Sequence, residues 1–571
     1  MTAQVSFTDI SEIAGLQTGT LNHGLALGDY NGDGWEDIYV ATKAGDNKLF
    51  RNNGDLTFSD VTNSAGVNDF SASYCALFFD VDNDGDQDLY VGNFNDPNSL
   101  FINHGDGTFS EEAAIRGADY DAQLRSMNAA DINNDGWLDI YLVNMNEENM
   151  CYFNNGDGTF TNMLGFSGAF DSLVGMGSIF FDYDNDGDQD LYLTHDANGA
   201  NKLYSNNGDG SFINLSVVSG LNYAGQGMGV DITDVNFDGW MDVYVTNNYD
   251  GNTLFLANGD GTYSNISQSA GIMDPGMSWG IAWTDADMDG HMDIYFANDY
   301  NFSPWTNKLY RNNGDLTFVD VAAGTPLESP YGGAGLACGD LDRNGSEDLV
   351  IAINGSGNSF DNQVLLNDLT DFQWIGIGLE GTVSNRDAIG ARITVYLPEV
   401  TRHDEINCGS GYSGQNSKQL LFGLGEVTQV DSVIIRWPSG LYETYYNPEI
   451  NQYHHWMEGE APEEEIEEEP YVPPTHNISE AINTLPQTPL VVEDVDISPL
   501  LIYPNPSTGQ FNLKSSQALE IEVRNLSGQL LSKVSFSGNY VLYISDWSSG
   551  NYVLRWQTQN AVGAQLLHVV R

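Results

Sequence analysis

The stretch that decides the fold is GLALGDYNGDGWEDIYVAT, residues 24–42. Its acidic centre, DYNGDGWED from Asp29, recurs as DVDNDGDQD at Asp80, DINNDGWLD at Asp131, DYDNDGDQD at Asp182, DVNFDGWMD at Asp234, DADMDGHMD at Asp285 and DLDRNGSED at Asp340. Successive starts differ by 51, 51, 51, 52, 51 and 55 residues. A period near 50 residues with several short strands in each unit is typical of propeller blades, so the sequence predicts an all-β, seven-bladed β-propeller.

Each unit is expected to contain four strands. One apolar run leads into the acidic stretch, a second leaves it, and a third such as NKLFRNNGD meets a fourth across an Asn-Gly-Asp turn. The seventh unit ends near Asp368 without a fourth strand, whereas Phe7 precedes Asp29 by the same 22 residues that separate each hairpin aromatic from the next acidic stretch. We therefore expect the N-terminal strand to close the ring; its insertion into a neighbouring molecule, giving a swapped polymer, is the alternative.

The acidic stretches predict calcium loops. Oxygen-bearing side chains stand at positions 1, 3, 5 and 9, with glycine at position 6 for the sharp bend. Calcium takes six to eight oxygen ligands, whereas magnesium demands tighter octahedral geometry. Turns without metal are the alternative, and repetition in every unit argues against them. We expect about seven calcium ions, one per blade.

The candidate ligands share these four loop positions. They are Asp29, Asn31, Asp33 and Asp37; Asp80, Asp82, Asp84 and Asp88; Asp131, Asn133, Asp135 and Asp139; Asp182, Asp184, Asp186 and Asp190; Asp234, Asn236, Asp238 and Asp242; Asp285, Asp287, Asp289 and Asp293; and Asp340, Asp342, Asn344 and Asp348. The seventh set departs from the pattern because Asn344 replaces the aspartate at position 5. Since affinity follows ligand charge and the rigidity of the site, we expect the seventh site to be the first to lose its ion.

Two resemblances extend this interpretation. The loops and their spacing resemble the FG-GAP or VCBS repeat, a calcium-binding blade also found in integrin α-subunit heads, over residues 1–371. In residues 372–459, NRDAIGAR and RWPSG resemble the ASPIC/UnbV domain that follows such propellers in cartilage-acidic-protein-like chains. Leu421 stands where that family often has histidine. The resemblance implies a second small β domain. We expect calcium to have a structural role, because it pins the turn between the two inner strands of each unit.

The remainder of the chain resembles an export signal. Residues 460–498 are acidic and rich in proline, which indicates an extended linker, with a functional acidic tail as the alternative. Residues 499–571 resemble the sorting domain of the bacterial type IX secretion system through Tyr503, Pro504, Asn505, Pro506, Gly528, Gly550 and Tyr552. This implies a β-sandwich-like domain, the type IX machinery as a partner, and a secreted or outer-surface location. Because the opening MTAQVSFTDIS lacks a secretory signal, we expect that signal to have been trimmed.

Composition limits the partners. Lys and Arg number 19 against 81 Asp and Glu, and the formal net charge of −62 argues against nucleic acid and anionic membranes. No apolar run reaches 18 residues, so no transmembrane segment is expected. Cys75, Cys151, Cys338 and Cys408 have no CxxC spacing, and we expect buried thiols, with one disulfide as the alternative.

No set of catalytic residues can be recognised in the sequence. His195, His291, His454 and His455 lack metal-binding spacing, so we expect packing or surface roles for them. The favoured function is a non-enzymatic binding or adhesion scaffold for glycans, matrix or surface proteins. A self-assembling fibre subunit and a calcium-dependent polysaccharide-cleaving enzyme are the alternatives. Four aromatic residues near the sixth blade have the chemistry to stack on sugars or to pack between blades: Trp279, Trp283, Tyr300 and Trp305.

Overall fold

The computed structural model describes residues 5–163, 168–169, 171–299, 305–354 and 362–461, and five strands between residues 500 and 569. The chain forms two compact units, Met1–Glu465 and Ile466–Arg571. Strands dominate, and the helices of the described residues are single turns: α1 (Ser11–Ala14), α2 (Thr62–Ala65), α3 (Ala113–Arg116), α5 (Ser216–Ser219) and α6 (Ser267–Ala270). None of these helices is long and apolar enough to cross a membrane.

Most of the first unit is a repeated four-stranded antiparallel arrangement. In chain order its strands are β2 (Asn22–Gly28), β3 (Asp37–Thr42), β4 (Lys48–Asn52) and β5 (Phe58–Asp60); β6 (Ser73–Phe79), β7 (Asp88–Pro97), β8 (Ser99–Asn103) and β9 (Phe109–Glu111); β10 (Asp121–Ala130), β11 (Asp139–Asn144), β12 (Met150–Asn154) and β13 (Phe160–Asn162); β14 (Gly175–Phe181), β15 (Asp190–His195), β16 (Lys202–Asn206) and β17 (Phe212–Asn214); β18 (Gly227–Thr233), β19 (Asp242–Asn247), β20 (Thr253–Ala257) and β21 (Tyr263–Asn265); and β22 (Ser278–Thr284), β23 (Asp293–Asn298), β24 (Lys308–Asn312) and β25 (Phe318–Asp320). The last sheet contains β26 (Gly333–Gly339), β27 (Asp348–Ile353), β28 (Gln363–Asn367) and the N-terminal strand β1 (Phe7–Asp9).

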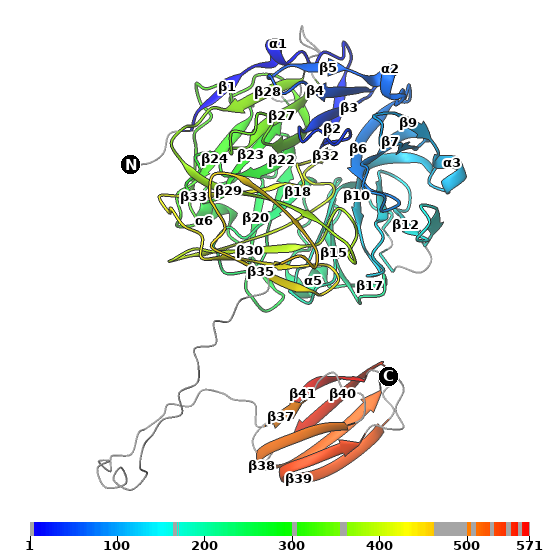
Figure 1. Ribbon diagram of the computed structural model, residues 1–571, viewed down its shortest axis with the longest axis vertical. Coiled ribbons are helices and arrows are strands. Elements are labelled where there is room, and N and C mark those ends of the chain that lie inside the picture. The colour runs from blue at the N-terminus through cyan, green and yellow to red at the C-terminus, as the bar shows by residue number, and fades with distance from the viewer. Residues whose placement is uncertain are drawn as a thin grey trace. The chain divides into compact units, whose positions relative to one another are not determined.

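Strand β1 joins the two ends of the ring. Phe7 pairs with Asn367, and Asp9 pairs with Leu365, in an antiparallel register. The first strands β2, β6, β10, β14, β18, β22 and β26 lie against one another in this order, and β26 lies against β2. The ring is therefore closed, as the sequence of colours from blue to green in Figure 1 shows. The all-β propeller and its closure by the N-terminal strand are confirmed, and the strand is used within its own chain.

The layers between neighbouring sheets form the core. Strands β2 and β3 are buried at every position, because both faces of each sheet pack against neighbours. One layer, for example, brings Leu25 and Val40 of one sheet against Ala337 and Val350 of the next. All four cysteines are free and buried, which confirms the expected thiols. Burial raises the pKa of Cys408 to about 12, so its reactive thiolate form is suppressed.

A buried asparagine at the end of the third strand fastens several sheets to their neighbours. Asn103 Nδ2 donates to Tyr30 O at 2.7 Å, and Asn154 Nδ2 donates to Val81 O at 2.8 Å. The oxygen of the Asn154 amide accepts from the backbone of its own hairpin turn, so the amide spans two sheets. Ala257 occupies this position in the β18–β21 sheet. The sequence repeat NNGD therefore encodes an inter-sheet bond as well as a turn.

We expect N154A to lower the free energy of unfolding by about 1–3 kcal/mol, because it leaves a buried carbonyl without its donor. The matched control is N155A, since the Asn155 amide is exposed and its bonds, to Thr159 and Thr161, stay within the same hairpin. The control should change stability by less than about 0.5 kcal/mol. Urea unfolding of both variants measures the difference. An equal loss of stability in N154A and N155A would show that the bond between sheets contributes nothing.

A second β domain follows the ring within the same compact unit. Its strands are β29 (Gln373–Glu380), β30 (Arg392–Tyr396), β31 (Thr401–Glu405), β32 (Gly414–Gln415), β33 (Leu420–Gly425), β34 (Ser432–Arg436), β35 (Tyr442–Tyr446) and β36 (Tyr453–Met457). One sheet has the order β33-β29-β36 and the other the order β31-β30-β34-β35. The yellow strands lie across the ring in Figure 1.

Residues 406–417 of the second domain, here called the central segment, enter the ring. Strand β32 pairs in parallel with β2, through Gly414 with Leu25 and Gln415 with Ala26. Ala129 N of β10 donates to Cys408 O at 3.1 Å, and Gly411 exchanges two backbone bonds with Val230 of β18. A Cβ at Gly411 would lie 2.6 Å from Ile281 O of β22. The central segment therefore contacts first strands all around the ring, and its glycines permit that approach.

The second unit is one antiparallel sheet. Its strands are β37 (Leu500–Tyr503), β38 (Gln510–Asn525), β39 (Leu530–Tyr543), β40 (Gly550–Gln557) and β41 (Val562–Val569), in the order β37-β38-β40-β41 with β39 also paired to β38. Tyr503, Gly550 and Tyr552 fall on its strands. Pro504, Asn505, Pro506, Gly528 and the predicted linker after residue 461 lie outside the described residues.

Candidate metal centre

Each acidic loop joins the first strand of a sheet to the second, and its own backbone wraps it. In the loop between β6 and β7, Asp80 at position 1 accepts from Asp84 N at 3.2 Å and from Gly85 N at 2.8 Å. The bend uses left-handed backbone at Asn83 (φ 54°) and Gly85 (φ 96°), the second of which favours glycine. This winding turns alternate side chains toward the inside of the loop.

The aspartate at position 9 holds the loop to two strands. Asp88 Oδ1 accepts from Asn103 N of the third strand at 2.8 Å, and Asp88 Oδ2 accepts from Val81 N at 2.9 Å. Asp139 repeats both contacts in the next sheet, with Asn154 N at 2.8 Å and Ile132 N at 3.0 Å. These two hydrogen bonds fix the orientation of the position-9 carboxylate toward position 1.

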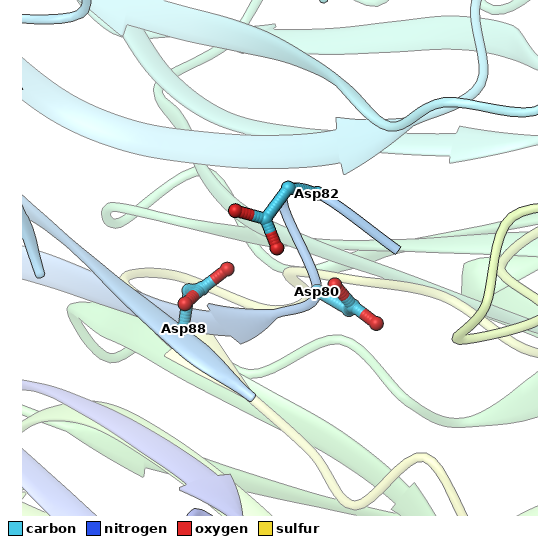
Figure 2. A group of neighbouring side chains, drawn as sticks. All are labelled: Asp80, Asp82 and Asp88. Carbon is cyan, nitrogen blue, oxygen red and sulfur yellow. The ribbon is translucent and has the colours of Figure 1, made fainter. Parts of the chain in front are cut away.

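Four loops gather three carboxylates each. In every group, one oxygen from each residue lies within 4.8 Å of the others: Asp80, Asp82 and Asp88; Asp182, Asp184 and Asp190; Asp285, Asp287 and Asp289; and Asp340, Asp342 and Asp348. Figure 2 shows the first group around a shared space between the loop and the start of β7. Position 9 takes part in the second, fourth and seventh loops, and position 5 takes part in the sixth.

The other sequence-predicted ligands are placed differently. Asn31 Nδ2 donates to Asp37 Oδ2 at 3.1 Å, and Asn236 Nδ2 donates to Asp238 Oδ2 at 2.9 Å, so asparagine at position 3 bonds to the loop's own carboxylates. In the seventh loop, Asn344 Nδ2 donates to Asn367 O at 2.9 Å, and its oxygen accepts from Ser346. Both ends of the Asn344 amide are thus engaged outside the group of three carboxylates.

The donor set fits a hard divalent cation. Asp82 Oδ1, Asp184 Oδ1, Asp285 Oδ1 and Asp287 Oδ1 are buried without a hydrogen-bond partner. Burial raises the pKa of Asp88 to about 8 and the pKa of Asp287 to about 6. A bound cation reverses this penalty, because it keeps crowded carboxylates ionised and supplies the partner that the free oxygens lack. All of these donors are oxygens, the ligands that calcium and magnesium prefer.

The second domain covers these loops. Arg436 pairs with Asp182, and Tyr453 Oη donates to Asp340 Oδ2 at 2.6 Å. Asp80 N donates to Asp387 Oδ2 at 2.8 Å. The segment NRDAIGAR, which carried the family resemblance, supplies Asp387 and also the backbone N–H of Arg386, which donates to Asn83. The sequence did not predict this contact, although the local match marked the residues that make it.

The loop that carries Asp387 is held by Glu458. Glu458 Oε2 accepts from three consecutive backbone N–H groups, Thr382 at 2.8 Å, Val383 at 2.7 Å and Ser384 at 2.8 Å. Its other oxygen accepts from the hydroxyls of Ser384 and Ser439. Although burial alone would raise it, these donors hold the pKa of Glu458 below its usual value.

We expect E458Q to destabilise the first unit by about 1.5–3 kcal/mol at neutral pH, because several charge-assisted bonds are lost. The folded-state pKa of Glu458 is depressed, so its contribution is present above the unfolded pKa and lost as pH falls through the folded pKa. The difference between wild type and E458Q should therefore shrink below about pH 4. Denaturant unfolding from pH 3.5 to 7.5 measures it, with E449Q on an exposed turn as control. A difference that does not vary with pH would contradict the role of the charge.

The histidines have structural partners. His195 Nε2 lies 3.1 Å from Asp171 Oδ2, and Lys202 Nζ lies 2.7 Å from the same oxygen. Burial would raise the pKa of Asp171, but His195 and Lys202 lower it to about 2. His454 Nε2 contacts Glu449 O at 2.8 Å, His455 Nε2 lies 3.2 Å from Glu380, and the His291 ring lies against Phe237.

The aromatic residues singled out near the sixth blade divide into two kinds. Trp283 is 4% exposed and packs against Tyr244 and Phe318, so the packing alternative is right for this residue. Trp279 is half-buried and Trp305 is 41% exposed. Tyr300 lies outside the described residues.

Comparison with known proteins matches three segments of the chain. The FG-GAP-like repeat matches residues 29–91, 80–142, 131–193, 182–245, 234–296 and 289–351. ASPIC and UnbV matches residues 381–463, and the secretion system C-terminal sorting domain matches residues 501–568.

Curated relatives cover less of the chain. Cartilage acidic protein 1 of Homo sapiens is 29% identical over 245 residues, covering 39% of this chain and 37% of the relative, and that of Xenopus tropicalis is 27% identical over 305 residues, covering 46% of each. The chain thus spans less than half the length of these relatives. Among solved structures, YCF48 bound to D1 peptide aligns with a TM-score of 0.41 and 10% identity, over 65% of this chain and 98% of that chain.

Proposed function

The chain belongs to the FG-GAP-like repeat family, and from this we propose that it is a calcium-stabilised binding scaffold for glycans, matrix or other surface proteins. It is secreted to the outer cell surface, since its C-terminal unit is a type IX sorting domain. Extracellular calcium suits loops whose donors are all oxygens. We place the propeller at residues 1–371, the ASPIC/UnbV domain at 372–459 and the sorting domain at 499–571.

The burial of the loop carboxylates carries the proposal. Asp80 and Asp88 are each 1% exposed, and the second domain lies over several of the loops. A catalytic metal needs a coordination position open to substrate, whereas an ion enclosed by the frame stabilises the fold. Calcium at all seven sets of loop residues would therefore act on stability. The scaffold is then rigid, and recognition falls to side chains that differ between the repeats.

A fibre built by strand exchange is less favoured than a scaffold that acts on its own. Strand β1 is already paired with β28 of the same chain, which satisfies the edge that a swapped neighbour would use. Sedimentation in calcium distinguishes a single species from a growing polymer.

Removal of calcium should lower the thermal midpoint of the first unit. A ligand that binds only the folded state adds about 2.7 kcal/mol per site at a hundredfold excess over its Kd. Thermal unfolding in millimolar calcium, in chelator, and in chelator followed by magnesium measures this effect. We expect calcium to restore the midpoint and magnesium to restore it incompletely. An unchanged midpoint in chelator would contradict a structural role.

The seventh site should be the first to empty during partial chelation, because the Asn344 amide is engaged elsewhere and Tyr453 shares Asp340. Crystals equilibrated at falling free calcium give the occupancy of each site. N344D should delay the loss at this site, and N313D, on an exposed hairpin, is the control. If the seventh ion is the last to leave, the predicted ranking of the sites is wrong.

The binding role is tested on a glycan array in calcium, paired with an assay for products released from soluble polysaccharides. Signal on the array without released product is the expected result. Unsaturated or reducing-end products would instead establish the polysaccharide-cleaving alternative.

A further inference from the structure

The first strand of every sheet in the ring has a bulge at the same place. The register shifts directly after Asn22 in β2, and after the equivalent first paired residues of β6, β10, β14, β18, β22 and β26. The residues that follow are His23, Tyr74, Arg125, Met176, Met228, Trp279 and Ala334. These side chains differ while the surrounding repeat is retained. At this place, therefore, the backbone is the same in each sheet whereas the side chains differ.

These residues surround the tip of the central segment. Tyr412 is fully buried, and its ring lies 5.4 Å from the ring of His23 and 4.9 Å from the ring of Trp279. Met176 and Met228 pack against it as well. Because the first strands run from this point toward the acidic loops, Tyr412 lies at the end of the ring opposite the loops that the second domain covers. His23 is also buried, whereas other aromatic and basic side chains at this end are only partly buried, namely Lys43, Tyr74, Phe94, Arg125 and Trp279.

Two cations share one aromatic ring at this end. The Arg125 guanidinium lies 4.9 Å from the centroid of the Tyr74 ring, and Lys43 Nζ lies 5.1 Å from the same centroid. Arg125 also lies 5.4 Å from the Phe94 ring. Within the described part of the chain, no carboxylate is within ion-pair distance of either cation. In a chain with 81 acidic residues, an unpaired basic pair is unexpected for a purely structural feature.

The local potential is positive. Burial and the charge of Arg125 lower the pKa of Lys43 to about 8, and the charge of Asp299 offsets this only in part. Burial, Lys43 and Arg125 lower the pKa of His23 well below its usual value, although its bond to Tyr74 O opposes them. Like charges held together with only a partial counter-charge cost free energy, which a bound anion would recover.

Three hydrogen-bond donors here lack an acceptor. Arg125 Nε and Trp279 Nε1 have no partner, and the Tyr412 hydroxyl has no acceptor for its own proton, since its neighbour Arg125 can only donate. The Arg125 side chain also donates to the sulfur of Met145, a weak acceptor. A buried donor without an acceptor costs about 1–3 kcal/mol, so three of them beside two unpaired cations indicate a missing anionic acceptor.

We propose that this end of the ring binds a sugar carrying a singly charged anion, the carboxylate of a uronate or a sulfate ester. Arg125 and Lys43 bind the anion, and the partly exposed faces of Tyr74, Phe94 and Trp279 pack against the sugar ring. Two cations partly offset by Asp299 suit one negative charge better than two. The net charge of the protein does not prevent binding, because charges beyond about 8 Å are screened at physiological salt. This inference deepens the proposed function and depends on it.

Calorimetric titration at a fixed free calcium concentration tests this site. The probes are trigalacturonate, a sulfated galactose trisaccharide, and neutral galactotriose. We expect at least one anionic probe to bind and the neutral probe not to bind. R125Q and K43Q should each weaken binding by about tenfold or more, and R125K should also bind more weakly because lysine lacks the planar fork. The matched control R51Q, on exposed Arg51 of β4, should bind as wild type does.

Comparison of the two anionic probes shows whether the site binds a carboxylate or a sulfate ester, and either result supports the site. Thermal unfolding without ligand shows whether R125Q still folds; if it does not, K43Q carries the test. The inference is overturned if neither anion binds the wild type, if the neutral sugar binds equally well, or if R125Q and K43Q bind unchanged. If R125Q and K43Q still bind their ligands on the glycan array, the proposed binding role stands and only this site is ruled out.

Discussion

The crowding of buried carboxylates between the first and second strands is the constraint on which the rest of the molecule depends. Each loop concentrates negative charge at the point where the sheet turns, and it does so in a chain that already carries a formal charge of −62. Backbone N–H groups satisfy part of this charge, as at Asp80 and Asp88. Oxygens such as Asp82 Oδ1 remain buried and unpartnered. A cation at each loop would neutralise the remaining negative charge and hold the first and second strands of the sheet together.

This constraint also explains why the second domain sits where it does within the first unit. Arg436 and Tyr453 approach Asp182 and Asp340 at position 1 of their loops. Cover of this kind keeps water from these position-1 carboxylates and strengthens the electrostatic interactions around them. The central segment then extends from the covered end into the ring as far as Tyr412. We propose that the covered end supports the fold and that the opposite end carries recognition.

The repeated parts of this fold could be predicted because they have a period. The interval from Phe7 to Asp29 placed β1 beside β28, and the 51-residue spacing located the loops. The central segment could not be predicted in the same way, since its text, NCGSGYSG, has no alternation and its strand β32 is two residues long. Its position comes from contacts with strands hundreds of residues earlier. The inter-sheet role of Asn154 was hidden because its NNGD motif already had an explanation as a turn.

Within the candidate metal centre, sequence position was a partial guide to geometry. Positions 1, 3 and 9 converge in the second, fourth and seventh loops, whereas position 5 replaces position 9 in the sixth. Position 9 is bonded to the third strand in the second and sixth loops alike, so neither that bond nor the spacing accounts for the difference between them. Likewise, Trp279 and Trp283 were indistinguishable in sequence, and only the bulge in β22 turns one toward the end of the ring while the other packs between sheets.

The most direct measurement is a crystallographic map with anomalous data, collected from crystals grown in millimolar calcium. The account predicts anomalous peaks enclosed by Asp80, Asp82 and Asp88 and by their counterparts in the other loops, with carboxylate oxygens at calcium distances of about 2.3–2.6 Å. Loops without peaks, with the same carboxylates bonded to one another through shared protons, would contradict it.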